Sequence, residues 1–526
     1  MTKVEKTVSR EKERKMFVGV VWNCAAELKL LLTALLLLFS VVTLLQFLPP
    51  RFSISSTDLN PCTITTHLLI NKTKNDVPNI TCNEVSGLSN LCNDKYPISE
   101  KEKEKTTNSS SNQTTPTNNN GIIKRSFKPY GAAAYNFILM SAYRGSLNSF
   151  AINGLASKPL IVFGKPTYVC KWVPNDPSQE PIITNGVKML PDWGYGRVYT
   201  VVIINCTFQT PIVGGNDGKL HLLATTNGGG DTALNTTDTF VALTEKKREF
   251  DDFNMKLSNV TPKYDYFYCG SSLYGDLSPQ RVREWVAYHV KFFGEKSHFV
   301  IHDAGGIHEQ VMEVLKPWIE KGYVTLQDIR EQERFDGYYH NQFLVVNDCL
   351  HRYRFMTKWM FFFDVDEFIF VPKKSTIKSV LNSLSDFTQF TIEQMPMSNG
   401  LCLSEDIRKS YRKWGFEKLV YKDVKKGIRR DRKYAVQPRN VFSAGVHMSE
   451  NTVGKTTHKT EGKIMYYHYH GTIADRHEPC RRHVNSSTIT FDGTPYVADT
   501  TMRDIAGVIK RFELKMIGPI LQRTRQ

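Results

Sequence analysis

The pattern of apolar and polar positions begins with one long hydrophobic run. Residues 30–48 carry no charge, are rich in Leu and end at Pro49-Pro50. A run of this length can cross a bilayer as a helix. More Lys and Arg than Asp and Glu precede it, so the positive-inside rule predicts a cytosolic tail at 1–29 and a luminal chain after residue 50. A cleaved signal peptide is the alternative, but the long charged lead argues against it.

A polar stretch follows the predicted membrane helix. Residues 97–122 contain alternating Glu and Lys at 100–105, followed by Ser, Asn, Thr and Gln, so they have almost nothing to bury. Such a composition predicts disorder. We therefore expect a partly disordered luminal stem at 49–126.

Short apolar runs between turn residues occupy 127–255. The runs lie at 160–163, 168–172, 197–204, 220–224 and 239–243, with Gly- and Asn-rich turns between them. This rhythm predicts an all-β module, most simply a sandwich. Its Trp172, Trp193 and Tyr195 are candidates for an aromatic platform that binds a glycan. The alternative is that one or two of them belong to the core.

After Pro262 the rhythm changes to strands that alternate with helices. Strands are predicted at 264–269, 298–301 and 323–326, and helices at 307–321, interrupted near Pro317, and at 342–352. A further helix begins at Ser278-Pro279, where a capping hydroxyl precedes a first-turn proline, and ends at Gly294. Repeated β-α-β units predict an α/β domain over 262–515, with a mostly parallel sheet and ligands at the carboxyl ends of its strands.

Two carboxylates end one of these predicted strands. The apolar run 360–363 leads into Asp364-Val-Asp366, and the alternation of side chains puts both acids on one side of the backbone. Two carboxylates this close repel each other unless a cation lies beside them. Mg²⁺ and Mn²⁺ prefer oxygen ligands and are commonly shared with phosphates, so the pattern indicates a metal that grips a diphosphate leaving group. The alternative is that the acids are solvated or paired with Arg352 and Arg354.

Sequons and cysteines bear on the compartment. Asn-x-Ser/Thr sequons lie only after the hydrophobic run, and those outside the Ser- and Asn-rich tract are Asn71, Asn79, Asn205, Asn235, Asn259 and Asn485. Of the ten cysteines, only Cys24 precedes the run, which leaves an odd number in an oxidising lumen. At least one thiol is then free or paired between chains, and a homodimer stays open. Cys170 and Cys206 are candidates for a bridge within one module.

Four motifs together carry a resemblance to a known family. The motifs are His298-Phe-Val-Ile-His-Asp303, Asn347-Asp-Cys-Leu350, Asp364-Val-Asp-Glu-Phe368 and Tyr467-His-Tyr-His470. They resemble glycosyltransferase family 92, and the β module is similar to the carbohydrate-binding module that precedes the catalytic domain there. The resemblance implies a GT-A glycosyltransferase fold with a Rossmann-like mixed sheet, a single-pass type II protein of the Golgi membrane and a UDP-galactose donor. It also implies Mn²⁺, with Mg²⁺ as the alternative, and transfer with inversion onto β-1,4-galactan side chains of pectin.

The resemblance also assigns roles at the metal and donor site. Asp364 and Asp366 would hold the metal directly or through water, with His468 as the third ligand. His470 is the alternative to His468, because the segment alternates and both side chains point the same way. Asp303 ends an early strand, where GT-A enzymes contact the nucleoside; the alternative is a capping role before Ala304-Gly-Gly306. Weaker candidates for donor binding are Arg334, Gln342, Lys433 and His470. Surface solvation is the alternative for the first three.

Inversion requires a general base on the acceptor side. Ser404-Glu405-Asp406 resembles the x-Glu-Asp element of many inverting GT-A enzymes, which makes Asp406 the first candidate, with Glu405 and Glu367 behind it. The alternative is that these residues cap a helix and complement its dipole.

The net charge of +16 also requires explanation. A dense basic stretch spans 408–433. In a Golgi protein a nucleic acid is not an expected partner, whereas the acidic backbone of pectin would be attracted to such a surface. An ordinary solvated surface is the alternative.

The sequence is also compatible with two other functions. One is a transferase of the same fold that uses another UDP-sugar, such as UDP-arabinopyranose, since the loss of one hydroxymethyl group changes binding by only about 1–3 kcal/mol. The other is a non-catalytic glycan-binding protein in which the β module is the working part.

Overall fold

The computed structural model describes residues 122–130, 135–157, 166–189, 198–213, 217–226, 236–258, 261–335, 339–428, 430–474 and 476–523. The predicted membrane helix and most of the stem lie outside these residues, as do Trp193, Tyr195, Asn71, Asn79, Asn235 and Asn259. Within the described ranges, no helix has the length and apolar character needed to cross a membrane.

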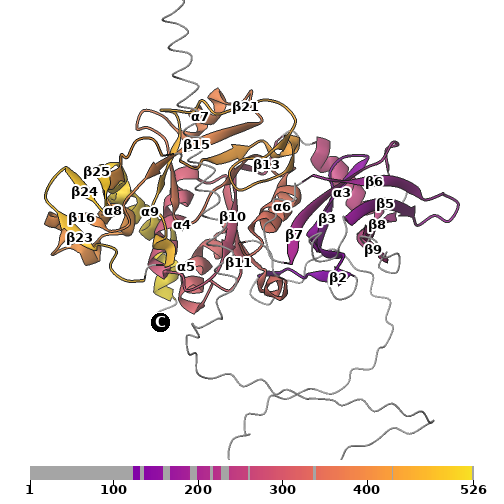
Figure 1. Ribbon diagram of the computed structural model, residues 1–526, viewed down its shortest axis with the longest axis horizontal. Helices are drawn as coiled ribbons and strands as arrows, with labels where there is room; N and C mark the ends of the chain where they lie inside the picture. The colour runs from indigo at the N-terminus through magenta and orange to yellow at the C-terminus, as the bar shows by residue number, and fades with distance from the viewer. Residues whose placement is uncertain are drawn as a thin grey trace, which may run out of the picture. The chain divides into compact units, whose positions relative to one another are not determined.

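A mixed sheet forms the centre of the larger half (Figure 1). Four of its neighbouring strands run parallel, namely β12 (Val324–Asp328), β11 (Ser297–Asp303), β10 (Tyr264–Leu273) and β13 (Thr357–Phe362). The strands β18 (Lys433–Val436), β15 (Gln389–Pro396), β22 (Met465–His468) and β14 (Glu367–Phe370) continue it on the β13 side. Strand β18 is antiparallel to β13, so the sheet is mixed, as the family resemblance implied, and most of its described strand pairs are parallel, as the β-α-β pattern predicted.

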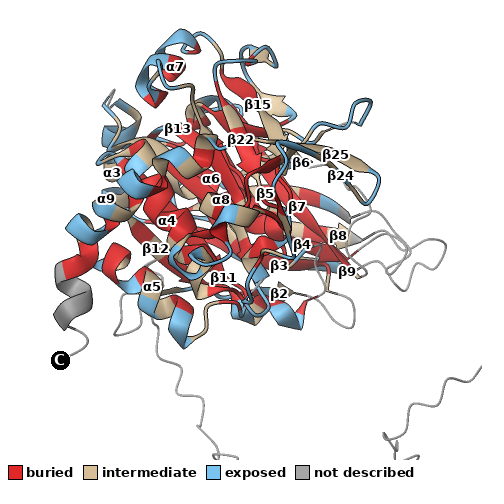
Figure 2. Ribbon diagram, turned by 90° about the vertical axis from the view of Figure 1, so that its left-hand side faces the viewer, coloured by how far each residue is buried: buried red, intermediate tan, exposed pale blue. Residues whose placement is uncertain are grey.

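Helices cover both faces of this sheet. On one face lie α4 (Pro279–Phe293), α5 (Glu309–Glu320) and α9 (Thr501–Arg523), whose apolar residues share a core with β11 and β13. On the other lies α6 (Gln342–Tyr353), packed on Phe267, Met360 and Phe362. Figure 2 shows the strands buried along their lengths between these layers.

The helix boundaries follow the sequence signals closely. Helix α4 is capped by Ser278, whose side chain accepts from the Arg281 amide, and stops at Gly294 with a φ of 81°. The predicted interruption at Pro317 is wrong, because α5 runs through it. Proline removes one hydrogen bond to the residue four positions earlier. That residue, Glu313, is exposed, so its carbonyl can be solvated.

The β-rich half is one connected antiparallel sheet folded over its own core. In spatial order its strands are β2 (Lys128–Tyr130), β3 (Phe137–Arg144), β4 (Ser149–Ser157), β7 (Tyr199–Thr207), β6 (Ile182–Lys188), β5 (Pro166–Pro174), β8 (Gly218–Thr226) and β9 (Thr236–Glu245), and α3 (Lys247–Ser258) follows them. The Cys170–Cys206 bridge joins β5 to β7, as predicted. Trp172 is only 1% exposed and stacks on Phe150, so it is a core residue and not part of a glycan platform.

The two halves pack on a common core, and the chain contributes a strand to the larger sheet before it enters the β-rich half. Apolar residues of β3, β4 and β7 that face away from the β-rich core pack against Leu344 and Val345 of α6. The short strand β1 (Ile123–Lys124), from the segment predicted as stem, pairs with β12 at the edge of the mixed sheet. The chain therefore enters the larger sheet before it forms the β-rich half.

Smaller elements complete the described chain. The helical ones are η2 (Arg330–Arg334), α7 (Ile377–Ser383), η3 (Ser404–Asp406), η4 (Ser410–Arg412), α8 (Gly415–Lys418), η5 (Pro438–Asn440) and η6 (Thr472–Ala474). The strands are β16 (Leu401–Leu403), β17 (Tyr421–Asp423), β19 (Val441–Ser443), β20 (Asn451–Thr452), β21 (Thr456–Thr457), β23 (Arg482–Val484), β24 (Thr488–Phe491) and β25 (Thr494–Ala498). Two more disulfides join Cys269 to Cys349 and Cys402 to Cys480.

Candidate active site

Polar residues from several strands meet at one edge of the mixed sheet. Asp364 and Asp366 lie in the turn between β13 and β14, at the carboxyl end of the parallel strand β13. At the same edge β18 begins with Lys433, and β22 ends with His468, which pairs in register with Glu367. This edge is where ligands bind in sheets of this kind.

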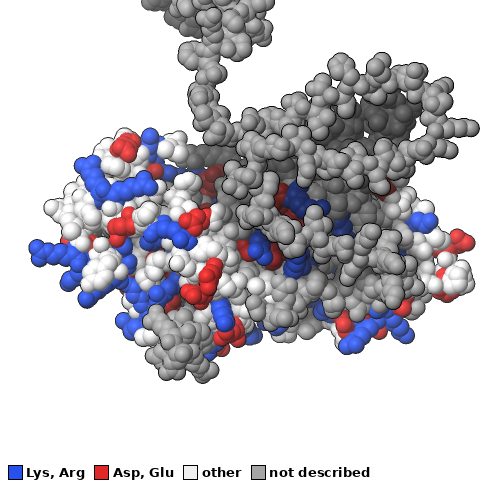
Figure 3. Space-filling view, turned by 90° about the horizontal axis from the view of Figure 1, so that it is seen from below, with Lys and Arg blue, Asp and Glu red and all other residues white. Residues whose placement is uncertain are grey.

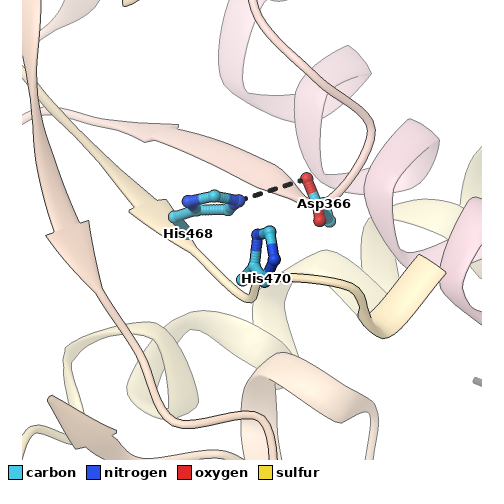
Figure 4. Close-up of side chains that lie close together, drawn as sticks. All are labelled: Asp366, His468 and His470. Carbon is cyan, nitrogen blue, oxygen red and sulfur yellow. Dashed lines mark ion pairs between the residues drawn. The ribbon is translucent and has the colours of Figure 1, made fainter. Parts of the chain in front are cut away.

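Asp366, His468 and His470 form a cluster that can hold a metal ion (Figure 4). One ligand atom from each lies within 4.8 Å of the others. The Nε2 atom of His468 is 3.6 Å from Oδ1 of Asp366. Burial alone would lower the pKa of His468, but the nearby carboxylates of Asp366 and Glu367 outweigh it, and the pKa lies above its ordinary value.

Neighbouring groups hold these side chains in place. The Gly471 amide donates to Oδ2 of Asp366 at 2.9 Å, and the Tyr469 amide donates to its carbonyl at 3.0 Å. The amide group of Gln394 lies 2.5 Å from Nδ1 of His468. When the Gln394 oxygen faces that atom, it accepts Nδ1–H and leaves Nε2 free for a metal, which is the usual arrangement of a metal-binding histidine.

The donor set is compatible with a divalent transition metal. One carboxylate and two imidazoles differ from the all-oxygen surroundings that Mg²⁺ prefers. Imidazole suits the transition metals, so this set favours Mn²⁺ over Mg²⁺. In the part of the chain that the structure describes, the cluster contains both His468 and its predicted alternative His470, and it does not include Asp364.

Asp364 has other partners. Its Oδ2 accepts from Lys433 Nζ at 2.6 Å and its Oδ1 from Gln342 Nε2 at 3.3 Å, which brings two predicted donor-site residues to the site. Burial would raise the pKa of Asp364, but Lys433 lowers it below its usual range. The alternative pairing with Arg352 and Arg354 is wrong, because Arg352 pairs with Asp348 and Arg354 donates to the Arg439 carbonyl.

Glu367 lies beneath the two aspartates. It is 1% exposed and its Oε2 accepts from the Asp364 amide at 2.7 Å. Burial raises its pKa to about 8, even though Lys433 Nζ lies 3.7 Å away and opposes the shift. A carboxyl group this deeply buried supports the aspartate turn and does not reach an acceptor hydroxyl.

The surroundings of Asp406 argue against its predicted role as general base. It is 2% exposed, it ends the short helix η3, and its carboxylate pairs with Lys413 and with Arg503 of α9 at 3.0 Å. Glu405 is exposed and pairs with Arg503 at 2.9 Å. A base needs an accessible oxygen, and both oxygens of Asp406 are taken. No contact between described residues joins Asp406 to the cluster of Asp366, His468 and His470.

Two other predicted donor-site residues have local partners. Oδ1 of Asp303 accepts hydrogen bonds from the amides of Gly305 at 2.8 Å and Ile307 at 3.1 Å. The carboxylate thus holds the loop before α5, a role similar to the capping role given as its alternative. Burial raises its pKa. Arg334 is exposed and pairs with Glu331 at 3.1 Å, in agreement with the surface alternative. The described contacts bring neither residue to the metal cluster.

Comparison with known proteins identifies the family. Residues 264–504 match the model of glycosyltransferase family 92. The whole chain is 57% identical to galactan beta-1,4-galactosyltransferase GALS3 of Arabidopsis thaliana, and the match covers 100% of both chains. The chain belongs to glycosyltransferase family 92. The family predicted from the sequence motifs is thereby confirmed.

Two further Arabidopsis relatives match this family 92 chain over most of its length. Galactan beta-1,4-galactosyltransferase GALS2 is 57% identical, with 98% of each chain covered. Galactan beta-1,4-galactosyltransferase GALS1 is 52% identical, and the match covers 77% of this chain and 80% of GALS1.

Some residues at the site of this family 92 member carry no sequence signal. Gln394 belongs to no motif, and only the pairing of β15 with β22 brings it beside His468. Tyr339, His340 and Asn341 all have positive φ, and they directly precede Gln342. Such strain persists where surrounding contacts hold it, and here Tyr274 stacks on His340 with ring centroids 3.8 Å apart.

The basic stretch 408–433 is less open to an acidic partner than its composition indicated. Several of its cations are already paired within the protein, namely Lys413, Lys418, Lys422, Arg430, Arg432 and Lys433. Over the face shown in Figure 3, the described basic and acidic side chains are interspersed.

The two described sequons differ in setting: Asn485 is exposed and Asn205 is half-buried in β7.

Proposed function

We propose that the protein is a metal-dependent galactosyltransferase that transfers galactose from UDP-galactose to the end of β-1,4-galactan chains. The identity of 57% over the full length of an Arabidopsis galactan beta-1,4-galactosyltransferase carries this proposal. The cluster of Asp366, His468 and His470 supports it, because its donor atoms are close enough to share one ion.

The proposal includes the fold type, the stereochemistry and the location. A GT-A fold is supported by the parallel strands β10 to β13 with an Asp-x-Asp turn at the carboxyl end of β13. Transfer with inversion and a Golgi membrane location, in which galactan is extended on pectin, come from the family resemblance. The uncharged run at 30–48 supports a single membrane anchor.

The mechanism assigns separate tasks to the residues at this edge. Asp366, His468 and His470 would hold Mn²⁺. When bound, the ion supplies charge stabilisation for the UDP leaving group. Gln394 orients the His468 ring, and the Gly471 amide fixes the Asp366 carboxylate. Lys433 keeps Asp364 ionised and in place, and Gln342 holds its other oxygen.

A transfer assay with defined controls tests the proposal. The full chain, solubilised in detergent, is incubated with Mn²⁺, labelled β-1,4-galactotetraose and one of several UDP-sugars, including UDP-arabinopyranose. We expect extension from UDP-galactose that EDTA and Asp366→Ala both abolish. Asp386→Asn, an exposed carboxylate beyond the opposite end of β15, serves as a matched control and should keep full activity.

Other outcomes of this assay would contradict the proposal in different ways. Preferential transfer from UDP-arabinopyranose would reassign the donor. Binding of galactotetraose without transfer from any donor would favour the non-catalytic glycan-binding protein. Full activity of Asp366→Ala in EDTA would remove the metal from the mechanism.

A further inference from the structure

A cavity of about 630 Å³ opens beside the candidate active site. Its walls come chiefly from the end of β15, with Glu393 and Gln394, from the segment that leads into β18, with Asp431 and Arg432, and from Met448. This volume lies within the usual range for cavities that bind small ligands. None of the tasks assigned to the metal and donor residues uses this space.

The strand directions place the cavity at the same edge as the metal cluster. Strand β15 ends where β22 ends, since Pro396 pairs in register with His468. Gln394 both lines the cavity and contacts His468. Asp431 lies two residues before Lys433, which binds Asp364. The Tyr466 hydroxyl donates to the Asp431 carbonyl at 2.8 Å and fixes this segment.

The charges of the lining favour a neutral, hydroxyl-rich ligand. Both described arginines of the cavity are paired: Arg430 donates to Asp423 at 2.9 Å, and Arg432 lies 3.4 Å from Glu393. An acidic glycan would have to compete with these carboxylates. The lining instead offers polar groups of both kinds together with the apolar side chain of Met448, which is 38% exposed.

Asp431 differs from the other acidic residues near this edge. It is exposed, whereas Glu367 and Asp406 are buried. Among the described residues, no cation lies within ion-pair distance of its carboxylate; Glu393, by contrast, is paired with Arg432. An accessible carboxylate without a cationic partner, in a cavity next to the donor site, has the exposure and the free oxygens that a general base needs.

We propose that this cavity binds the end of the acceptor galactan chain and that Asp431 is the general base of the transfer. This inference rests on the proposed function. The acceptor hydroxyl oxygen forms a bond to C1 of galactose, and the bond from C1 to the UDP oxygen breaks, with the electron pair leaving on UDP. The hydroxyl proton passes to the Asp431 carboxylate.

Asp431→Asn in the full chain tests the base. With β-1,4-galactotetraose as acceptor we expect kcat to fall by about 100-fold or more, the usual contribution of a general base. The Kd for UDP-galactose should stay within about threefold of the unsubstituted protein, because the variant keeps the shape of the side chain. Asp386→Asn is the matched control. A kcat within about threefold of the unsubstituted protein would overturn the assignment of Asp431.

Met448→Trp tests the cavity independently of the base. The larger side chain should narrow the cavity and raise KM for galactotetraose by about tenfold, with the Kd for UDP-galactose unchanged. An unchanged KM would overturn the acceptor assignment. Competition by oligogalacturonide as strong as that by galactotetraose would overturn the neutral-ligand assignment. If the unsubstituted protein transfers no galactose at all, the proposed function fails; if it transfers galactose and both variants behave like it, only this inference fails.

Discussion

Arg125 and Asp348 form a buried ion pair with an N–O distance of 2.7 Å, although 223 positions separate them in the sequence. Asp348 is fully buried on α6, and its Oδ1 also accepts from the Tyr143 hydroxyl of β3 at 2.6 Å. The same helix begins at Gln342, which contacts Asp364 of the candidate site. The β-rich half and the catalytic edge are therefore attached to the same helix.

Loss of the Asp348 charge should destabilise the protein strongly. Asp348→Asn leaves the Arg125 guanidinium buried without its counter-charge, which typically costs about 3–5 kcal/mol. Tyr143→Phe removes one hydrogen bond to a charged group and should cost less, about 1.5–3 kcal/mol. Denaturant unfolding of both variants, with Asp386→Asn as the control, measures these losses of unfolding free energy. A loss below about 1 kcal/mol in Asp348→Asn would contradict the importance of this pair.

Gln394 should control metal affinity without touching the metal. Gln394→Leu keeps the approximate size of the side chain and removes its contact with Nδ1 of His468. Removal of such outer partners typically weakens metal binding by about 10–100-fold. Titration with Mn²⁺, followed by calorimetry, gives the Kd directly. An unchanged Kd would mean that His468 is oriented without Gln394.

Lys433 should be needed for the charge balance of the aspartate turn. Lys433→Met leaves Asp364 without its buried cation, so we expect the pKa of Asp364 to rise and the Kd for UDP-galactose with Mn²⁺ to increase. Lys433→Arg keeps the positive charge, so its Kd for UDP-galactose should increase less than that of Lys433→Met. Donor titrations at pH 6 and pH 8 separate the two effects, since the Met variant should recover part of its affinity at the higher pH. Equal affinity of both variants at both pH values would contradict this role.

Acid should destabilise the fold through buried neutral histidines. Burial lowers the pKa of His298 to about 4, and the ring contacts the Gly322 carbonyl and the Thr325 hydroxyl. The unfolded chain takes up this proton near pH 6.5 and the folded chain only near pH 4, so stability falls as pH falls through this window. Between pH 6.5 and pH 5 this side chain should account for about 2 kcal/mol.

His298→Gln provides the measurement. The variant lacks the titrating group, so its unfolding free energy should fall by about 2 kcal/mol less than that of the unsubstituted protein between these two pH values. Because His302 has a similarly lowered pKa of about 4, part of the acid sensitivity should remain. Parallel pH profiles for the two proteins would show that His298 titrates alike in the folded and unfolded chains.

Local sequence signals predicted the α/β half well. Helix α4 has its cap, first-turn proline and terminal glycine in the sequence itself, and its bounds match the prediction. Strands β3, β4 and β6 were missed. Strand β4 is buried at nearly every position and contains Gly154, and β6 is polar along much of its length, so neither shows a clear alternating pattern.

The site was only partly accessible from the sequence, because its partners come from distant segments. The turn with Asp364 and Asp366 was recognisable from its own residues. The cation that neutralises Asp364, Lys433, lies on a strand 69 residues later. The arginine that binds Asp406, Arg503, lies on a helix 97 residues later. No local pattern encodes either contact.

The short strand β1 changes what the β-rich half is. Because the chain adds Ile123–Lys124 to the edge of the mixed sheet before it forms β2, the β-rich half is an insertion between two pieces of one domain. A protein cut at residue 262 would lose an edge strand and leave Asp348 buried without Arg125 or Tyr143. The catalytic half is therefore not expected to fold when it is produced alone, and the two halves form a single folding unit.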